Sequence, residues 1–293
     1  MIIFPDISPN LFSFNIGGFE LALRWYALAY IIGILLGWQF ALLAIRRVYL
    51  WPKNRPPLES AQVENLLTWV IVGVILGGRL GYVIFYKPIY YLANPGQILM
   101  LWNGGMAFHG GLVGVIIAAF LFYRRNNVTY ASGADLLALC TPFGLLLGRL
   151  ANFINAELWG RATNLPWGVA FPGEAAQACG QVTGLCARHP SQLYEAFLEG
   201  LVLLLLLTYI SFRKRALTRP GLVTGTFFAG YGIARFIVEF ARQPDLHFQS
   251  ADNPLGYWFH IENFGITMGQ ILSLPMIFIG LALVIRAIHR PVS

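Results

Sequence analysis

Charged side chains are scarce in this sequence. Only 11% of the 293 residues are charged, 57% are hydrophobic, and the mean hydropathy is +0.62. A soluble domain carries about 25% charged residues. The composition therefore excludes an ordinary soluble protein and indicates one that lies in a membrane. We expect residues 1–293 to form a single membrane domain, because the length suits one compact helical bundle.

Cysteine and metal-binding patterns are scarce as well. The three cysteines, Cys140, Cys179 and Cys186, are too few for a disulfide scaffold and show no CxxC spacing. The histidines and carboxylates show no ligand spacing such as HExxH. We therefore expect neither a metal nor another cofactor. The first twenty residues lack a basic start followed by an apolar core, so they predict no cleavable signal peptide.

Apolar runs of membrane-spanning length are abundant. A helix needs about 20 mostly apolar residues to cross a bilayer. The sequence predicts seven such helices, near residues 22–45, 66–86, 106–123, 134–154, 194–212, 222–241 and 266–286. The expected fold class is therefore all-α, a polytopic membrane bundle of seven transmembrane helices.

The basic residues predict the orientation of the bundle. Twelve of them follow the first, third, fifth and seventh runs, namely Arg46, Arg47, Lys53, Arg55, Arg124, Arg125, Arg213, Lys214, Arg215, Arg219, Arg286 and Arg290. Four lie between the opposite ends, namely Lys87, Arg161, Arg188 and Arg242. Because basic loops stay in the cytoplasm, we expect a periplasmic N-terminus and a cytoplasmic C-terminus. This topology explains the net charge of +7 without a nucleic-acid partner.

Two long segments are expected on the outer side, 155–193 and 243–264. We expect 155–193 to form a small periplasmic cap between the fourth and fifth helices. It contains the large aromatic residues Trp159, Trp167 and Phe171. Cys179 and Cys186 also lie in it, and an oxidising compartment would allow them to pair, although two free thiols are the alternative.

Four arginines and one histidine lie inside or at the edge of apolar runs: Arg24, Arg79, Arg149, Arg235 and His109. An arginine within a membrane costs about 2.5–3.5 kcal/mol on insertion scales, and such residues usually mark a functional site. The direction of each run places all five in the outer half of the membrane. A shared anionic ligand would explain this common depth, and the guanidinium fork suits phosphate.

Pairing within the protein is the alternative explanation for these charges. Arg235 and Glu239 are four residues apart on one helix and can meet. Glu195 and Glu199 form an acidic stripe on the fifth helix, and Arg24 can snorkel to the interface. One face of the sixth helix carries Tyr231, Arg235, Glu239 and Arg242.

One run of thirteen residues carries a specific resemblance. Residues 148–160 read GRLANFINAELWG, which is similar to the signature of the prolipoprotein diacylglyceryl transferases. That signature fixes Gly-Arg, a small residue before Asn-Phe, a second Asn, a Glu and a closing Gly, and this sequence meets every one.

Other segments resemble the same family, in order, along nearly the whole chain. They are Arg24-Trp25-Tyr26, WNGGMAFHGG at 102–111, HPSQLYE at 189–195 and YGIARFIVEFARQPD at 231–245. Residues 162–187 match no part of the family pattern.

The resemblance implies a multi-pass enzyme of the bacterial inner membrane whose active site faces the periplasmic leaflet. Such an enzyme transfers diacylglyceryl from phosphatidylglycerol to the lipobox cysteine of a prolipoprotein signal peptide and releases glycerol-1-phosphate. Its partners would be these two substrates and the lipid bilayer. By motif match, Arg149 would bind the headgroup and Arg235 would be a second required arginine. The remaining matched positions are His109, Asn152, Glu157, Gly160, Tyr26, Tyr231, Glu195 and Glu239.

The chemistry suggests roles for some of these residues. The thiolate is the nucleophile, so His109 is a candidate general base. Arg149 and Arg235 would stabilise the charge that develops on the leaving phosphate. Asn152 can add a neutral hydrogen bond, whereas Glu157 and Glu239 are expected to orient arginines.

Two other classes of protein compete with this interpretation. A transporter of an anionic phospholipid or organic phosphate would also need arginines in a bundle, but the sequence shows no internal repeat. An intramembrane protease would need a serine nucleophile or an aspartate pair. The one aspartate within the predicted helices, Asp135, lies near the inner end and is interpreted as structural.

Overall fold

The computed structural model describes residues 1–16, 19–179, 184–244, 253, 255–261 and 264–290. Asp245, the last residue of the second arginine motif, lies outside the described residues, as does half of the predicted outer segment 243–264.

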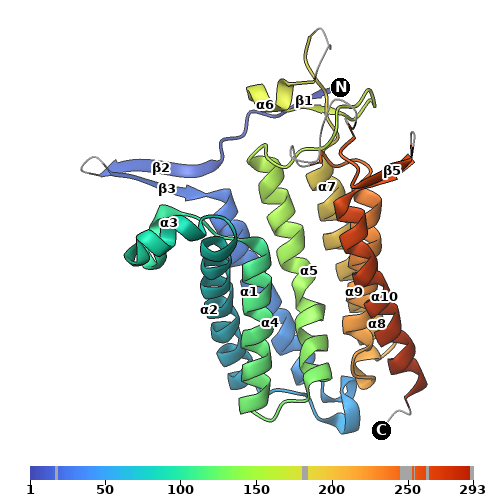
Figure 1. The fold of residues 1–293 in the computed structure, drawn as a ribbon. Coiled ribbons are helices and arrows are strands. Elements are labelled where there is room, and N and C mark those ends of the chain that lie inside the picture. Colours follow the sequence, from blue (N-terminus) through green and yellow to red (C-terminus); the bar gives the residue numbers. More distant parts are fainter. Residues whose placement is uncertain (17–18, 180–183, 245–252, 254, 262–263, 291–293) are drawn as a thin grey trace.

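The described chain is a bundle of long helices (Figure 1). They are α1 (Trp25–Arg46), α2 (Ser60–Phe85), α4 (Phe108–Arg125), α5 (Tyr130–Ile154), α7 (Ser191–Glu195) continuing through a π-helical turn (Ala196–Val202) into α8 (Leu203–Phe212), α9 (Leu222–Val238) and α10 (Met268–His289). Six of these, taking Ser191–Phe212 as one, are long and apolar enough to cross a membrane, whereas α9 is a shorter apolar helix. The helical, multi-pass prediction is confirmed, and each predicted run falls on a helix.

Closely spaced glycines bring neighbouring helices together. Gly73, Gly77 and Gly81 on α2 face Gly110 and Gly114 on α4. A Cβ atom at Gly77 would collide with the carbonyl oxygen of Gly110. Small residues allow this close backbone approach, which is a common way for membrane helices to associate.

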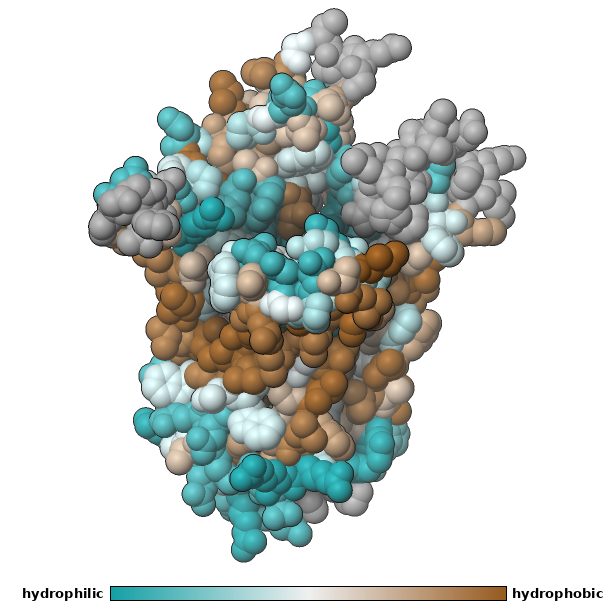
Figure 2. All heavy atoms as spheres, turned by 60° about the vertical axis from the view of Figure 1, so that its left-hand side comes forward, coloured by the Kyte–Doolittle hydropathy of each residue, from teal (hydrophilic) through white to brown (hydrophobic). Residues whose placement is uncertain are grey.

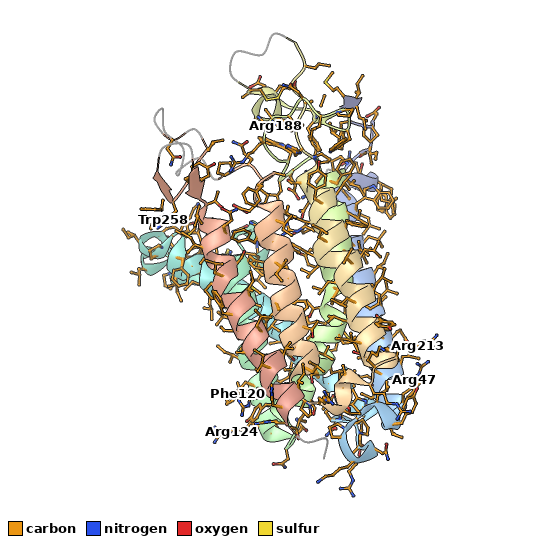
Figure 3. All side chains as sticks on the ribbon, turned by 90° about the vertical axis from the view of Figure 1, so that its right-hand side faces the viewer. Arg47, Phe120, Arg124, Arg188, Arg213 and Trp258 are labelled. Atoms are coloured by element: carbon orange, nitrogen blue, oxygen red, sulfur yellow. A yellow bond between two sulfur atoms is a disulfide. The ribbon has the colours of Figure 1, made fainter. Side chains whose placement is uncertain are left out.

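The surface is divided into a hydrophobic belt between two more polar ends (Figure 2). Figure 3 places Arg47, Arg124 and Arg213 at one end of the bundle and Arg188 at the other. These three basic residues, predicted to share one side of the membrane, thus lie at one end of the bundle. The belt is the surface that hydrocarbon chains would cover.

Short strands and turns lie at the end of the bundle opposite those three arginines (Figure 1). The strands β2 (Asn10–Ile16) and β3 (Phe19–Arg24) pair antiparallel, as do β5 (Phe259–Ile261) and β6 (Phe264–Ile266). The short helix α3 (Pro88–Ala93) projects sideways below the first hairpin.

The segment between α5 and α7 packs on the N-terminus of the chain. The strand β1 (Ile2–Ile3) pairs in parallel with β4 (Val169–Ala170), and Val169 bridges to Arg188. A small apolar core forms around Phe171, with Phe4, Phe153 and Trp159 packed against it. The short helix α6 (Glu174–Gln177) follows, and a disulfide joins Cys179 to Cys186. The structure therefore favours the paired state of these cysteines.

Asp135 has the structural role that the sequence suggested. Its carboxylate is fully buried and accepts hydrogen bonds from Gly221 N, Thr224 N and Thr224 Oγ1, each at 2.7 Å. These donors belong to the first turn of α9, where backbone N–H groups have no partner within the helix. Asp135 thereby ties α5 to the start of α9.

Candidate active site

Three arginines from two parts of the chain converge on one buried carboxylate. Glu195, at the end of α7, is 1% exposed. Arg149 Nε on α5 lies 2.6 Å from its Oε2, and Arg235 Nη1 on α9 lies 3.1 Å from its Oε1. Arg242, just beyond α9, places Nη1 2.6 Å from the same Oε1. We call the set Arg149, Arg235, Arg242, Glu195, Glu199 and Glu239 the arginine cluster.

Glu239 forms a second link between two of the arginines. Its Oε2 lies 2.9 Å from Arg235 Nη2 and 3.5 Å from Arg242 Nε. Thr267 Oγ1, which caps α10, donates to its Oε1 at 3.2 Å. Gly269 leaves the space that the carboxylate occupies, because a Cβ atom there would lie 2.5 Å from it. The predicted Arg235–Glu239 contact is therefore present, and Glu239 orients arginines as expected.

Glu199 is the least supported carboxylate of the cluster. It lies in the π-helical turn, its side chain is fully buried, and its Oε2 is 4.0 Å from Arg149 Nη2. Within the described residues neither of its oxygens accepts a hydrogen bond. The neighbouring Gly200 lets this turn press against Leu146 of α5. Turns of this kind are rare and occur often at functional sites.

The arginines are more accessible than the carboxylates. The side chains of Arg149, Arg235 and Arg242 are 21%, 19% and 20% exposed, whereas those of Glu195, Glu199 and Glu239 are at most 8% exposed. The cluster thus has acidic groups inside and guanidinium groups at its accessible face. Fixed guanidinium groups in a partly dehydrated place can bind a phosphate or stabilise a developing negative charge.

The signature loop after α5 is organised around Glu157. Asn152 Nδ2 and Asn155 Nδ2 donate to Glu157 Oε1 at 2.8 Å and 3.3 Å. Gln192 at the start of α7 donates to its backbone carbonyl. Glu157 therefore holds the two asparagines of the signature rather than pairing with an arginine, which differs from the role expected for it.

Gly160 joins three parts of the site through its backbone. Its N–H donates to His189 O at 2.8 Å, and Gly160 bridges to Arg242 in antiparallel fashion. A Cβ atom at this position would lie 2.8 Å from His189 Cβ and would collide with the carbonyl of Ala241. Only glycine fits here, so this residue sets the approach of Arg242 to the cluster.

Two tyrosines predicted for the site lie near the charges. The Tyr26 hydroxyl is 3.0 Å from that of Tyr30 and interacts electrostatically with Glu157 and Arg149. Tyr231 on α9 interacts electrostatically with Glu199 and other members of the cluster. Both hydroxyls belong to the surroundings of Arg149.

Arg79 does not belong to the cluster, which corrects the idea of one ligand shared by all the intramembrane arginines. It is 3% exposed and donates to Gln97 O at 2.7 Å, Ile98 O at 2.9 Å and Met100 O at 3.0 Å, and also to the carbonyls of Gly104 and Gly105. Its guanidinium lies over the ring of Tyr91. Arg79 therefore holds the loop before α4 in place.

His109 and Arg24 are also separate from the cluster. His109 is the second residue of α4 and is exposed, with its ring 5.6 Å from that of Phe108. Arg24 is exposed at the N-terminal boundary of α1. Among the described residues, no hydrogen bond or ion pair joins either side chain to the arginine cluster.

Comparison with known proteins identifies the family. The family model described as prolipoprotein diacylglyceryl transferase matches residues 12–286. This chain belongs to that family. It is 63% identical over 288 residues to a phosphatidylglycerol–prolipoprotein diacylglyceryl transferase of Roseobacter denitrificans, covering 98% of each chain. Its identity to the Ruegeria pomeroyi protein of the same name is 63% over 97% of this chain and 96% of that one, and to the Rhizobium meliloti protein 46% over 97% and 93%.

Family motifs alone did not indicate every member of the cluster. The charge pattern places Arg242 among the outer basic residues and also on one face with Glu239, but it does not predict that Arg242 pairs with Glu195. Glu199 was seen only as part of an acidic stripe. Which arginines meet Glu195 depends on contacts between residues 40 or more positions apart.

Arg188 is a further residue that motif analysis did not single out. Its buried guanidinium lies 3.9 Å from the ring centre of Trp159 and donates to Ala178 O at 3.0 Å, Gln243 Oε1 at 3.2 Å and Gly160 O at 3.3 Å. Burial lowers the pKa of Arg188. It thus ties the signature loop to the segment closed by the disulfide and to the chain just after Arg242.

Within the part of the chain that the structure describes, no group of three or more His, Cys, Asp or Glu residues could hold a metal ion.

Proposed function

We propose that this chain transfers the diacylglyceryl group of phosphatidylglycerol to the thiol of the lipobox cysteine of prolipoproteins. The names of its relatives give phosphatidylglycerol as the donor and a prolipoprotein as the acceptor of a diacylglyceryl group. Transfer to a cysteine thiol would form a thioether and release glycerol-1-phosphate. The observation that carries the proposal is the convergence of Arg149, Arg235 and Arg242 on buried Glu195, with their guanidinium groups partly accessible.

The bonds that form and break in this reaction indicate what the arginine cluster does. The cysteine thiolate attacks the carbon of the diacylglycerol part that bears the phosphate. A C–S bond forms there, and the C–O bond to the phosphate breaks with its electrons going to the phosphate oxygen, so that glycerol phosphate leaves. Negative charge on the phosphate therefore grows in the transition state. Arginines that are already fixed by carboxylates meet this charge without reorganisation, which lowers the barrier. Arg149 and Arg235 have this role, and Arg242 supports it.

The other predicted residues act around this centre. Asn152, held by Glu157, offers a neutral donor toward the lipid, and Tyr26 and Tyr231 line the surroundings of Arg149. Glu195 and Glu239 fix the arginines, and Gly160 places Arg242. His109 is the proposed base for the thiol proton. Because His109 is separate from the arginine cluster, we propose that it contacts the cysteine of the peptide and not the phosphate of the lipid.

We further propose seven crossings of the inner membrane, counting α9, with the N-terminus and the site on the periplasmic side. The end that carries Arg47, Arg124 and Arg213 would face the cytoplasm, in line with the retention of basic loops there (Figure 3). The segment 155–193 would then be a periplasmic cap.

An assay of the purified protein tests the proposal. Phosphatidylglycerol and a lipobox peptide are supplied, and glycerol phosphate release is measured together with the mass of the peptide. We expect release with the cysteine peptide and none with a serine peptide. Arg149→Ala should abolish release, whereas Arg124→Ala, at the opposite end, should behave as wild type. Lipid binding without product would instead favour a carrier of anionic phospholipid or organic phosphate.

A further inference from the structure

The formal charges of the arginine cluster cancel. Three guanidinium groups face three carboxylates, and the carboxylates are nearly or fully buried. The headgroup phosphate of phosphatidylglycerol is a diester with one negative charge. If every carboxylate stayed ionised, binding this lipid would leave a net negative charge in a poorly hydrated place. Such an uncompensated charge is costly, so a buried group tends to become neutral instead.

The three carboxylates differ in how well their charge is supported. Glu195 has ion pairs with Arg149, Arg235 and Arg242 at 2.6–3.1 Å. Glu239 has two ion pairs and a hydrogen bond from Thr267. Glu199 has no hydrogen bond within the described chain and one contact with Arg149 at 4.0 Å, the limit for an ion pair. Protonating Glu199 therefore needs less free energy than protonating Glu195 or Glu239, because fewer favourable contacts are lost.

We propose that Glu199 takes up one proton when the anionic lipid binds, and so balances the charge of the arginine cluster. This inference rests on the proposed function. Protonation neutralises one negative charge as the phosphate brings one in. It also weakens the 4.0 Å contact between Arg149 Nη2 and Glu199, so that this donor can turn to the phosphate. Glu199 is thus a positioning residue that acts through Arg149.

The surroundings of Glu199 fit this role. The groups that face it are Glu195 on its own helix, Arg149 on α5, Arg235 and Tyr231 on α9, and Arg242 after α9. Glu195 repels a second negative charge at Glu199, whereas the arginines stabilise it. When the phosphate binds to the arginines, Glu195 still repels a negative charge at Glu199. The arginines then stabilise the phosphate as well, and therefore stabilise ionised Glu199 less. The balance then moves toward the protonated carboxyl.

The test is the pH dependence of lipid binding. Binding of phosphatidylglycerol to the full-length protein in detergent is measured by calorimetry at several pH values, in two buffers with different ionisation enthalpies. Above the pH at which Glu199 of the free protein ionises, affinity should fall by about tenfold for each pH unit, because one proton is taken up with the lipid. In Glu199→Gln the affinity should not change with pH, and proton uptake should disappear. Glu64→Gln, an exposed change at the opposite end, is the matched control.

Several results would overturn the proposal. One is proton uptake by Glu199→Gln equal to that of wild type. Others are wild-type binding that takes up no proton at any pH, or loss of lipid binding by a well-folded Glu199→Gln. If that variant does not fold, infrared difference spectra of the wild type with labelled glutamate decide the question. Lipid binding must then increase the signal of neutral carboxylic acid, and no increase refutes the idea.

This experiment is separate from the test of the transferase. A protein that binds phosphatidylglycerol but releases no glycerol phosphate would refute the proposed function, and proton uptake could still be measured. Normal turnover with pH-independent binding would refute only the role of Glu199.

Discussion

Arg149 Nε on α5 lies 2.6 Å from Glu195 Oε2 at the end of α7. An arginine within an apolar helix is costly unless it is paired, and here the partner comes from the next span. The same carboxylate reaches Arg235 and Arg242. One glutamate therefore organises the cationic face of the site.

Glu195→Gln should lower kcat/KM for glycerol phosphate release by about 100-fold or more, because the charge that develops in the transition state would meet arginines that are no longer fixed. It should also destabilise the fold by about 3–5 kcal/mol, the cost of breaking a buried ion pair. The three guanidinium groups would lose their common anchor and repel one another. Turnover is measured beside thermal unfolding, with Glu64→Gln as control. Wild-type turnover in a folded Glu195→Gln protein would show that the arginines do not need this anchor.

Gly160→Ala should abolish transfer while the helices remain folded. The added methyl group would collide with the backbone at Ala241 and His189 and displace Arg242 from Glu195. Gly96→Ala is the matched control, because no atom lies within 4 Å of a Cβ atom there. Glycerol phosphate release and circular dichroism are recorded for both variants. An active Gly160→Ala protein would show that the close packing of Gly160 against Ala241 and His189 is not needed for transfer.

Arg79→Gln should reduce stability rather than lipid recognition. The substitution removes several part-buried hydrogen bonds to carbonyls of residues 97–105, at about 0.5–1.5 kcal/mol for each. We expect a lower midpoint of thermal unfolding and, in the folded fraction, a KM for phosphatidylglycerol within about threefold of wild type, in contrast to Arg149→Gln. A large rise in KM with unchanged stability would place Arg79 at the lipid after all.

Replacing both Cys179 and Cys186 with serine should loosen the segment that Arg188 ties to the signature loop. A disulfide that closes so short a loop contributes about 2–3 kcal/mol. Limited proteolysis should cut this segment sooner in the variant, and turnover should fall several-fold. Cys140→Ala, which removes the free thiol on α5, serves as control. Equal proteolysis rates would show that the bond adds no local stability.

Asp135→Asn should destabilise the bundle without altering lipid affinity. The amide can replace only part of the acceptor capacity that Gly221 and Thr224 use, and loss of a helix cap costs about 0.5–2 kcal/mol. Denaturant unfolding reports the loss, and binding of phosphatidylglycerol to the folded protein reports the site. Weaker lipid binding by this variant would contradict a purely structural role.

Much of the site could be predicted from short motifs. The signature run predicted Arg149, Asn152, Glu157 and Gly160 as one group, because they lie within twelve consecutive residues at the end of α5 and in the loop that follows. The i,i+4 spacing of Arg235 and Glu239 likewise predicted a contact that the structure shows. In contrast, Arg79 and Arg149 look alike in sequence, since each is an arginine in an apolar run, yet Arg79 binds backbone carbonyls of its own loop.

The sequence by itself determined that this is a multi-pass helical membrane protein and which family it belongs to. Long apolar runs must satisfy their backbone groups as helices in lipid, whatever their neighbours are, and the motifs are local strings. Only the tertiary structure decided which charges share Glu195 and that Arg188 ties the signature loop in place. It also decided that Glu199 accepts no hydrogen bond from the described part of the chain. These contacts join distant parts of the chain, and they depend on which helix faces meet.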